Sequence, residues 1–107
     1  GRSKDMFISG GVNVYPAEIE NQLLQHPDLR DAAVVGAADE TWGEVGVAFV
    51  VLREGVELSA GGLSEYLAGR LARYKVPKRF VAVSELPRTP YGKVVKAELA
   101  KLLEGGS

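Results

Sequence analysis

The sequence predicts an α+β domain, with a small sheet of about three strands and an N-terminal β-hairpin, flanked by about three helices. Two runs rich in valine and alanine have the length and composition of buried strands. Elsewhere, leucines recur at intervals of four, which is a spacing typical of an amphipathic helix. The chain has 107 residues, of which 46% are hydrophobic and 25% charged, and these values fit one globular domain.

The chain opens with a predicted short hairpin whose turn is Ser9-Gly10-Gly11, because glycine permits positive φ angles. Residues 12–14 follow as an extended segment. A first helix is predicted from Pro16 to about His26. Proline suits the first helical position, and the apolar residues after it share one helical face.

The next part of the chain supplies the predicted sheet. Residues 31–38 and 45–52 are its two long strands, and the polar loop between them, residues 39–44, indicates an antiparallel pair. A second amphipathic helix is predicted over residues 63–73, and a third, short strand over residues 79–83.

A stiff loop follows, because two prolines fix the backbone of residues 86–94 and a glycine allows a sharp bend. The last predicted helix spans residues 95–103. The expected organisation is a hinge and hairpin, an α/β core, a lysine-bearing loop, and a C-terminal helix with its tail: residues 1–15, 16–85, 86–94 and 95–107.

Composition argues against several classes of function. Thirteen basic and 14 acidic residues give a net charge of -1, so we expect no nucleic-acid partner. With no cysteine and one histidine, the chain offers no zinc site, and a reducing, cytoplasmic setting is compatible with it. The longest apolar run, residues 45–52, is far shorter than the roughly 20 residues of a membrane span.

Two long segments carry a family resemblance. GRSKDMFISGGVNVYPAEIE, residues 1–20, and LPRTPYGKVVKAEL, residues 86–99, resemble the C-terminal domain of the adenylate-forming enzyme superfamily. Their order and separation extend the resemblance over essentially the whole chain. The motif SGG-x-NVYPAEIE is more similar to that of acyl- and aryl-CoA ligases than to that of the adenylation domains of peptide synthetases.

The resemblance implies a mobile lid of an ATP-dependent, AMP-forming acid–CoA ligase. Such an enzyme turns a carboxylic acid and ATP into an acyl-AMP, and then transfers the acyl group to CoA. The implied partner is the N-terminal adenylation domain of the same enzyme, which binds ATP, Mg²⁺ and the acid. The lid alone is expected to be inactive and to hold no cofactor.

Lys93 is the catalytic residue that the resemblance implies. Adenylation moves negative charge across the α-phosphate, so a fixed ammonium group stabilises the transition state. Outside this motif, Lys93 would be read as an ordinary surface lysine. A nucleotide-binding P-loop fits poorly, because Pro87 stands where that motif needs glycine and Val94 where it needs serine or threonine.

The N-terminal motif implies two further roles. Lys4 matches the hinge position of the family, where the backbone must change its φ and ψ angles. Arg2 resembles the arginine that approaches the nucleotide. The plainer interpretation of Lys4 is a solvated charge, and the alternative for Arg2 is a disordered chain end.

Binding of CoA is implied for two groups of residues. The Ser9-Gly10-Gly11 turn resembles the family's path for the narrow pantetheine arm, and it is equally well explained as a hairpin turn. Trp42, Tyr74 and Lys78 match positions that contact the nucleotide end of CoA in some ligases. The alternative is that Trp42 covers the strand pair and that Tyr74 extends the apolar face of the second helix.

Two other functions stay open at this point. The chain could be a non-catalytic, stand-alone binding module of the same fold, which an upstream phosphate-loop domain in the same reading frame would exclude. It could also be the lid of an adenylation domain that loads a carrier protein, which needs no site for the CoA nucleotide. The sequence does not define which carboxylic acid is used.

Overall fold

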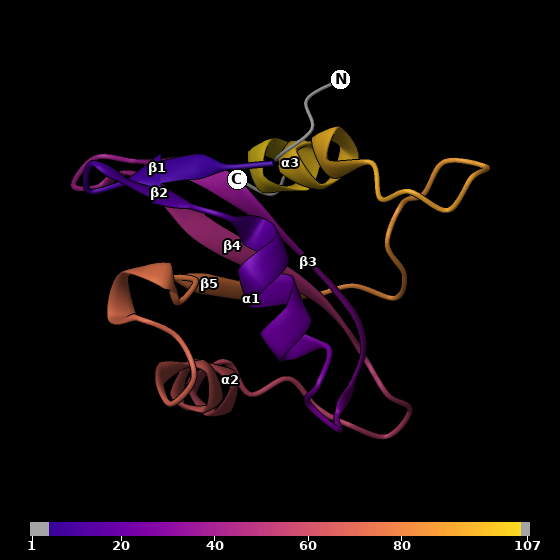
Figure 1. The fold of residues 1–107 in the computed structure, drawn as a ribbon. Coiled ribbons are helices and arrows are strands. Elements are labelled where there is room, and N and C mark those ends of the chain that lie inside the picture. Colours follow the sequence, from indigo (N-terminus) through magenta and orange to yellow (C-terminus); the bar gives the residue numbers. More distant parts are fainter. Residues whose placement is uncertain (1–4, 106–107) are drawn as a thin grey trace.

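A computed structural model describes residues 5–105, which form one five-stranded sheet with helices on both faces (Figure 1). The elements follow one another as β1 (Phe7–Ser9), β2 (Val12–Val14), α1 (Pro16–Leu23), β3 (Leu29–Asp39), β4 (Gly43–Leu52), α2 (Ala60–Ala68), the 3₁₀ helix η1 (Arg73–Lys75), β5 (Arg79–Ala82) and α3 (Lys96–Gly105). The predicted α+β class is confirmed.

Strand β4 is the centre of the sheet. One of its edges pairs with β3 in antiparallel fashion, from Leu29↔Leu52 to Asp39↔Gly43. Its other edge pairs with β5 in parallel and, at Ser9↔Gly43, with β1. The predicted N-terminal hairpin is confirmed as β1 and β2, and this bridge makes the hairpin part of the main sheet.

Each face of the sheet carries its own apolar cluster. Alternate residues of β3 and β4 point to opposite faces, as the two-residue period of a strand requires. One face packs beneath α1 and α2, and the other beneath α3, which lies on the opposite side of the sheet (Figure 1). The two strands are therefore buried on both sides, which explains their continuous apolar composition.

A β-bulge interrupts the alternation at the start of β3. The register shifts between Leu29 and Asp31, so Arg30 is an extra residue relative to β4. Leu29 consequently joins the cluster under α1 and α2, although it is two residues from Asp31. Asp31 therefore points to the same face of the sheet as Ala33, which belongs to the cluster under α3.

Phe7 anchors the hairpin to the sheet through a pair of glycines. Gly36 and Gly46 are direct partners across β3 and β4, and the buried Phe7 ring lies over both. A Cβ atom on Gly36 would be 2.7 Å from the Phe7 Cβ, and one on Gly46 would be 3.2 Å from Phe7 Cζ. The missing side chains therefore make the space that the ring fills.

A cluster of ion pairs joins the start of the described chain to α3 and α1. The Lys96 ammonium, on the first turn of α3, binds Glu20 Oε2 at 2.7 Å and also pairs with Asp5. Glu20 Oε2 in turn accepts the Val34 N–H at 2.8 Å. The segment just after position 4 is thus fixed to α3, α1 and β3.

The second helix differs from its predicted bounds. It begins at Ala60, because the Ser59 Oγ accepts the Gly62 N–H at 3.1 Å and caps it. It ends at Ala68, and Tyr74 lies on the separate 3₁₀ turn η1. The interpretation that Tyr74 extends the apolar face of this helix is therefore wrong.

The other helices keep their predicted places with shifted ends. Helix α1 stops at Leu23, before the predicted end at His26, and the chain continues in hydrogen-bonded turns. Helix α3 begins one residue later than predicted and runs to Gly105.

Candidate functional site

Four of the residues predicted to bind CoA meet in one groove. Ser9, Trp42, Tyr74 and Lys78 line it together with Arg73, and its volume is about 290 Å³. These side chains come from the end of β1, the β3–β4 turn, η1 and the segment just before β5. The groove is thus assembled from three regions that are distant in sequence, namely the end of β1, the β3–β4 turn and residues 73–78.

The backbone of Trp42 is fixed on both sides. Asp39 Oδ2 accepts the Thr41 N–H at 3.0 Å and the Trp42 N–H at 2.9 Å, which closes the β3–β4 turn. The Trp42 carbonyl accepts the Gly10 N–H at 2.8 Å, so the turns of the two hairpins are joined. The indole itself is 48% exposed and therefore available to a ligand.

Gly10 is required for two physical reasons. Its φ of +58° lies in the left-handed region, where residues with a Cβ are strained. A Cβ at this position would also be 3.0 Å from Trp42 Cε3. Gly11 shares the first requirement, with φ +83°, but no atom lies within 4 Å of its Cβ position.

The opposite wall of the groove is held by polar contacts of η1 and its neighbours. The Lys78 backbone N–H donates to the Gly46 carbonyl at 2.9 Å. The Lys78 ammonium group lies 5.8 Å from the Trp42 ring centroid. Lys75 pairs with Glu18 on α1 at 2.9 Å, which fixes η1 and leaves the Tyr74 ring 43% exposed. The hydrogen bond to Glu18 raises the pKa of Lys75, and desolvation acts against it.

The groove combines flat aromatic surfaces with positive charge. Trp42 and Tyr74 offer faces on which a planar heterocycle can stack, and Arg73 and Lys78 can bind phosphate oxygens. Among residues 5–105, no acidic side chain lines it. Arg73 was missed by sequence reasoning, although its place beside Tyr74 was a usable signal.

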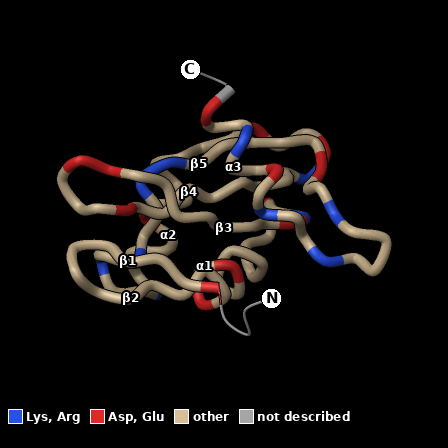
Figure 2. Tube along the Cα trace, turned by 90° about the horizontal axis from the view of Figure 1, so that it is seen from above, with Lys and Arg blue, Asp and Glu red and all other residues tan. Residues whose placement is uncertain are grey.

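Lys93 lies in a separate place, on the loop between β5 and α3. This loop projects from the side of the molecule opposite to β1 and β2 (Figures 1 and 2). Thr89 and Lys93 face each other across a tight turn, with the Thr89 N–H donating to the Lys93 carbonyl at 2.8 Å. Gly92 completes the turn with φ +87°, as the predicted sharp bend requires. The Lys93 side chain is exposed.

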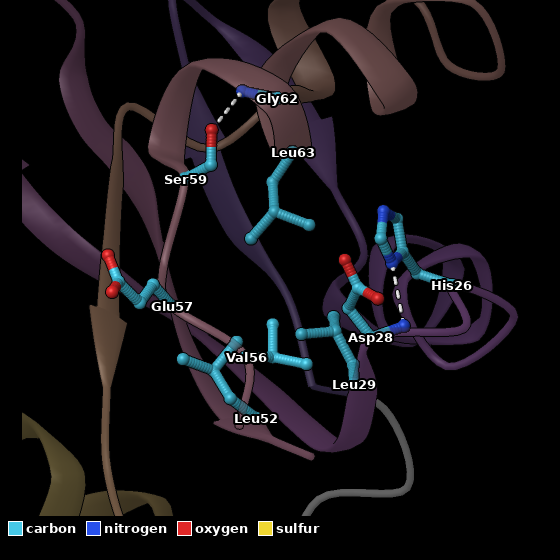
Figure 3. A pocket seen from close by; sticks show the side chains of 9 residues that line it. All are labelled: His26, Asp28, Leu29, Leu52, Val56, Glu57, Ser59, Gly62 and Leu63. Atoms are coloured by element: carbon cyan, nitrogen blue, oxygen red, sulfur yellow. Dashed lines mark hydrogen bonds between the residues drawn. The ribbon is translucent and has the colours of Figure 1, made fainter. Parts of the chain in front are cut away.

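A small hollow of about 110 Å³ lies where α1, α2 and the sheet meet (Figure 3). Its wall combines four leucine and valine side chains with polar residues, and two of its polar atoms already have hydrogen-bond partners. Ser59 Oγ caps α2, and His26 Nδ1 accepts the Asp28 N–H at 3.1 Å. None of the predicted site residues that the structure describes lines it. We interpret it as a feature of packing.

Arg2 and Lys4 lie outside the described residues. Within residues 5–105, no group of three or more histidine or acidic side chains could hold a metal ion. The same part of the chain has no helix that is long and apolar enough to cross a membrane.

Comparison with known proteins identifies a family. Residues 18–93 match the model of the AMP-binding enzyme C-terminal domain. The chain is 56% identical, over 103 residues, to an indoleacetate–CoA ligase of Aromatoleum aromaticum, covering 96% of this chain and 20% of that protein. It is 48% identical over 102 residues to a 2-succinylbenzoate–CoA ligase of Geobacillus kaustophilus, covering 95% of this chain and 21% of the ligase.

Comparison with solved structures identifies relatives of the same kind. The fold matches a fatty acyl CoA synthetase of Mycobacterium tuberculosis with a TM-score of 0.88 and 44% sequence identity, over 95% of this chain and 20% of the synthetase. The chain thus spans about a fifth of the length of the relatives that it matches.

Proposed function

The chain belongs to the family of AMP-binding enzyme C-terminal domains, and from this premise we propose that it is the mobile lid of an AMP-forming acid–CoA ligase. The reaction joins a carboxylic acid to AMP at the expense of ATP, and then transfers the acyl group to CoA. The N-terminal adenylation domain is the partner that binds ATP, Mg²⁺ and the acid, in the cytoplasm. This lid contributes different residues to each half-reaction.

One observation carries the proposal, namely that the end of β1 and the β3–β4 turn, which help to form the groove, lie on the side of the domain opposite to the Lys93 loop (Figure 1). When the lid presents Lys93 to the active site, the groove points away from that site. When the lid has turned, the groove faces the active site and Lys93 points away. Two half-reactions with different needs can thus share one active site. Lys4 is the proposed hinge for this turn, and Arg2 the nucleotide contact.

In the adenylation pose, the Lys93 ammonium stabilises charge on the α-phosphate and the attacking carboxylate. The exposed side chain on a rigid turn suits this role, because a preorganised charge needs little rearrangement during the reaction. Residues 86–94 are therefore the catalytic-lysine loop in this proposal.

In the thioester pose, the groove receives CoA. The pantetheine arm passes Ser9, Gly10 and Gly11, where the two glycines leave the backbone uncovered. The adenine stacks between the Trp42 and Tyr74 faces, and the phosphates meet Lys78 and Arg73. This use of the groove favours CoA over a carrier protein as the acceptor.

Separate assays of the two half-reactions, in the ligase that contains this chain, test the proposal. Lys93→Ala should slow acyl-AMP formation by about 10²–10³-fold and leave thioester formation from supplied acyl-AMP nearly unchanged. Trp42→Ala should have the opposite pattern, with a KM for CoA raised by about tenfold because one stacking face is lost.

Lys93→Arg is the matched control, because it keeps the charge and changes its shape and reach. We expect it to retain more adenylation than Lys93→Ala does. Equal losses in both half-reactions for Lys93→Ala would show a structural role and refute the proposal.

A further inference from the structure

The backbone of the Lys93 loop is held by its own side chains. Arg88 and Val94 form an isolated antiparallel bridge, which brings the two arms of the loop together. The two ends of the loop are held by apolar packing, since Leu86 is buried in the cluster under α3 and Val94 packs against that cluster. The tip has no such support, because Tyr91 is 97% exposed.

Thr89 holds both backbone polar groups of Lys93. Its Oγ1 accepts the Lys93 N–H at 3.1 Å and the Tyr91 N–H at 3.2 Å. Its own N–H donates to the Lys93 carbonyl at 2.8 Å. The direction in which the lysine side chain leaves the backbone is therefore set largely by Thr89.

Arg88 connects the same turn to the sheet. Its Nη1 donates to the Gly92 carbonyl at 2.6 Å, and its Nη2 pairs with Asp31 Oδ2. One guanidinium group thus reaches the residue before Lys93 and a carboxylate on β3. A guanidinium group is planar and rigid, so it suits such a double contact better than the ammonium group of a lysine would.

Asp31 is available for this contact because of the β-bulge at the start of β3. The bulge turns Asp31 to the face that packs beneath Leu86 and α3, whereas Leu29 points to the other face. The Asp31 Oδ1 accepts the Ala32 N–H at 2.9 Å, so its carboxylate is fixed to the strand itself. The turn is therefore linked to strand β3, which pairs with β4 along its whole length.

We propose that Arg88 and Thr89 are positioning residues, which hold the backbone around Lys93 in the geometry that adenylation needs. The inference rests on the proposed role of Lys93 and goes beyond it. Neither residue has to touch ATP or the acid, since each acts through the turn. Removing either should let the Lys93 ammonium spread over several positions, and a misplacement of about 1 Å can cost about 100-fold in rate.

The test uses Arg88→Met and Thr89→Val in the ligase that contains this chain. Each should lower the kcat of acyl-AMP formation by about tenfold, with the KM for ATP and the thioester half-reaction within about twofold of the wild type. Thr89→Ser keeps the hydroxyl and should restore most of the rate. Lys101→Met is the matched control, because it removes an exposed cation that pairs with Glu98 on α3, away from the loop.

A double substitution separates this inference from the proposed function. If Arg88 acts through Lys93, then adding Arg88→Met to Lys93→Ala should cause no further loss. A further tenfold loss, or unchanged adenylation in both single variants, would overturn the inference while leaving the role of Lys93 intact. Normal adenylation in Lys93→Ala would instead overturn the proposed function and the inference with it.

Amide hydrogen exchange of the 107-residue chain gives a reading that does not depend on activity. The Lys93 amide should be protected in the wild type, should exchange at least about tenfold faster in Thr89→Val, and should stay protected in Thr89→Ser and Lys101→Met. An unprotected Lys93 amide in the wild type would overturn the proposal.

Discussion

Replacing Gly36 by alanine tests how the hairpin is attached to the sheet. The new Cβ would lie 2.7 Å from the Phe7 Cβ and 2.8 Å from its Cγ, distances that real side chains do not tolerate. Both groups are held rigidly, Gly36 by the central strand pair and Phe7 by its pairing with Val14. We therefore expect β1 to be pushed away from the sheet.

The cost of this change follows from the geometry. Overpacking a well-filled core by one methyl group destabilises a protein by about 1–3 kcal/mol. Since about 1 kcal/mol lowers the melting temperature of a domain of this size by about 4–8 °C, Tm should fall by about 4–24 °C.

Thermal and urea unfolding followed by circular dichroism measure the effect. Gly61→Ala is the matched control, because Gly61 lies on α2 and its Cβ position meets no atom within 4 Å. We expect it to stabilise the domain by about 0.4–1 kcal/mol, through a less flexible unfolded chain. The cost of Gly36→Ala should shrink in a Phe7→Ala background, where the ring is gone. An unchanged cost there, or no cost at all, would refute the reasoning.

Two further predictions concern the groove. Gly10→Ala and Gly11→Ala should each cost about 1–2 kcal/mol from their positive φ angles, but only Gly10→Ala should change the fluorescence spectrum of Trp42, against which its Cβ would press at 3.0 Å. Identical spectra for the two variants would contradict this. Because the hydrogen bond to Glu18 raises the pKa of Lys75, their pair stabilises the fold below the ordinary lysine pKa, and the contribution is lost as the pH rises through the raised value. Urea unfolding should show Glu18→Gln less stable than the wild type at pH 8, and the difference should shrink as the pH rises through the raised pKa of Lys75, whereas a difference that does not shrink would contradict the sign.

Much of the fold could be predicted from periodicity and turn chemistry. The two long strands and their antiparallel pairing followed from continuous apolar runs, and the hairpin turn from its two adjacent glycines, both of which have positive φ angles. The end of the second helix could not be predicted this way. Leu71 continues the leucine spacing of that helix, yet the chain turns at Gly69 and Leu71 packs from an irregular segment. Apolar spacing reports which residues are buried, and tertiary packing can bury them without a helix.

The site was less accessible to sequence reasoning, because its parts meet only in three dimensions. The family motifs singled out Trp42, Tyr74 and Lys78, and the structure brings all three to one groove. The contact between Arg88 and Asp31 carried no such signal. That contact depends on a one-residue bulge that decides which face Asp31 takes, and no local pattern announces such a bulge.

Under the proposed function, the strand pair also explains why the whole domain, and not one loop, would have to turn. Trp42 lies in the β3–β4 turn, three residues after β3 ends at Asp39, and Asp31, which anchors the lysine loop through Arg88, lies eight residues before that end. At about 3.3 Å per residue, the strand separates the two sites by about 25 Å. Both are fixed to this strand pair, Trp42 through Asp39 and the lysine loop through Arg88. A shift of one loop cannot bridge that distance while the sheet stays intact. Under the proposed function, exchanging Lys93 for the groove at one active site therefore requires rotation of the domain as a rigid body, about a pivot that precedes the Asp5–Lys96 contact.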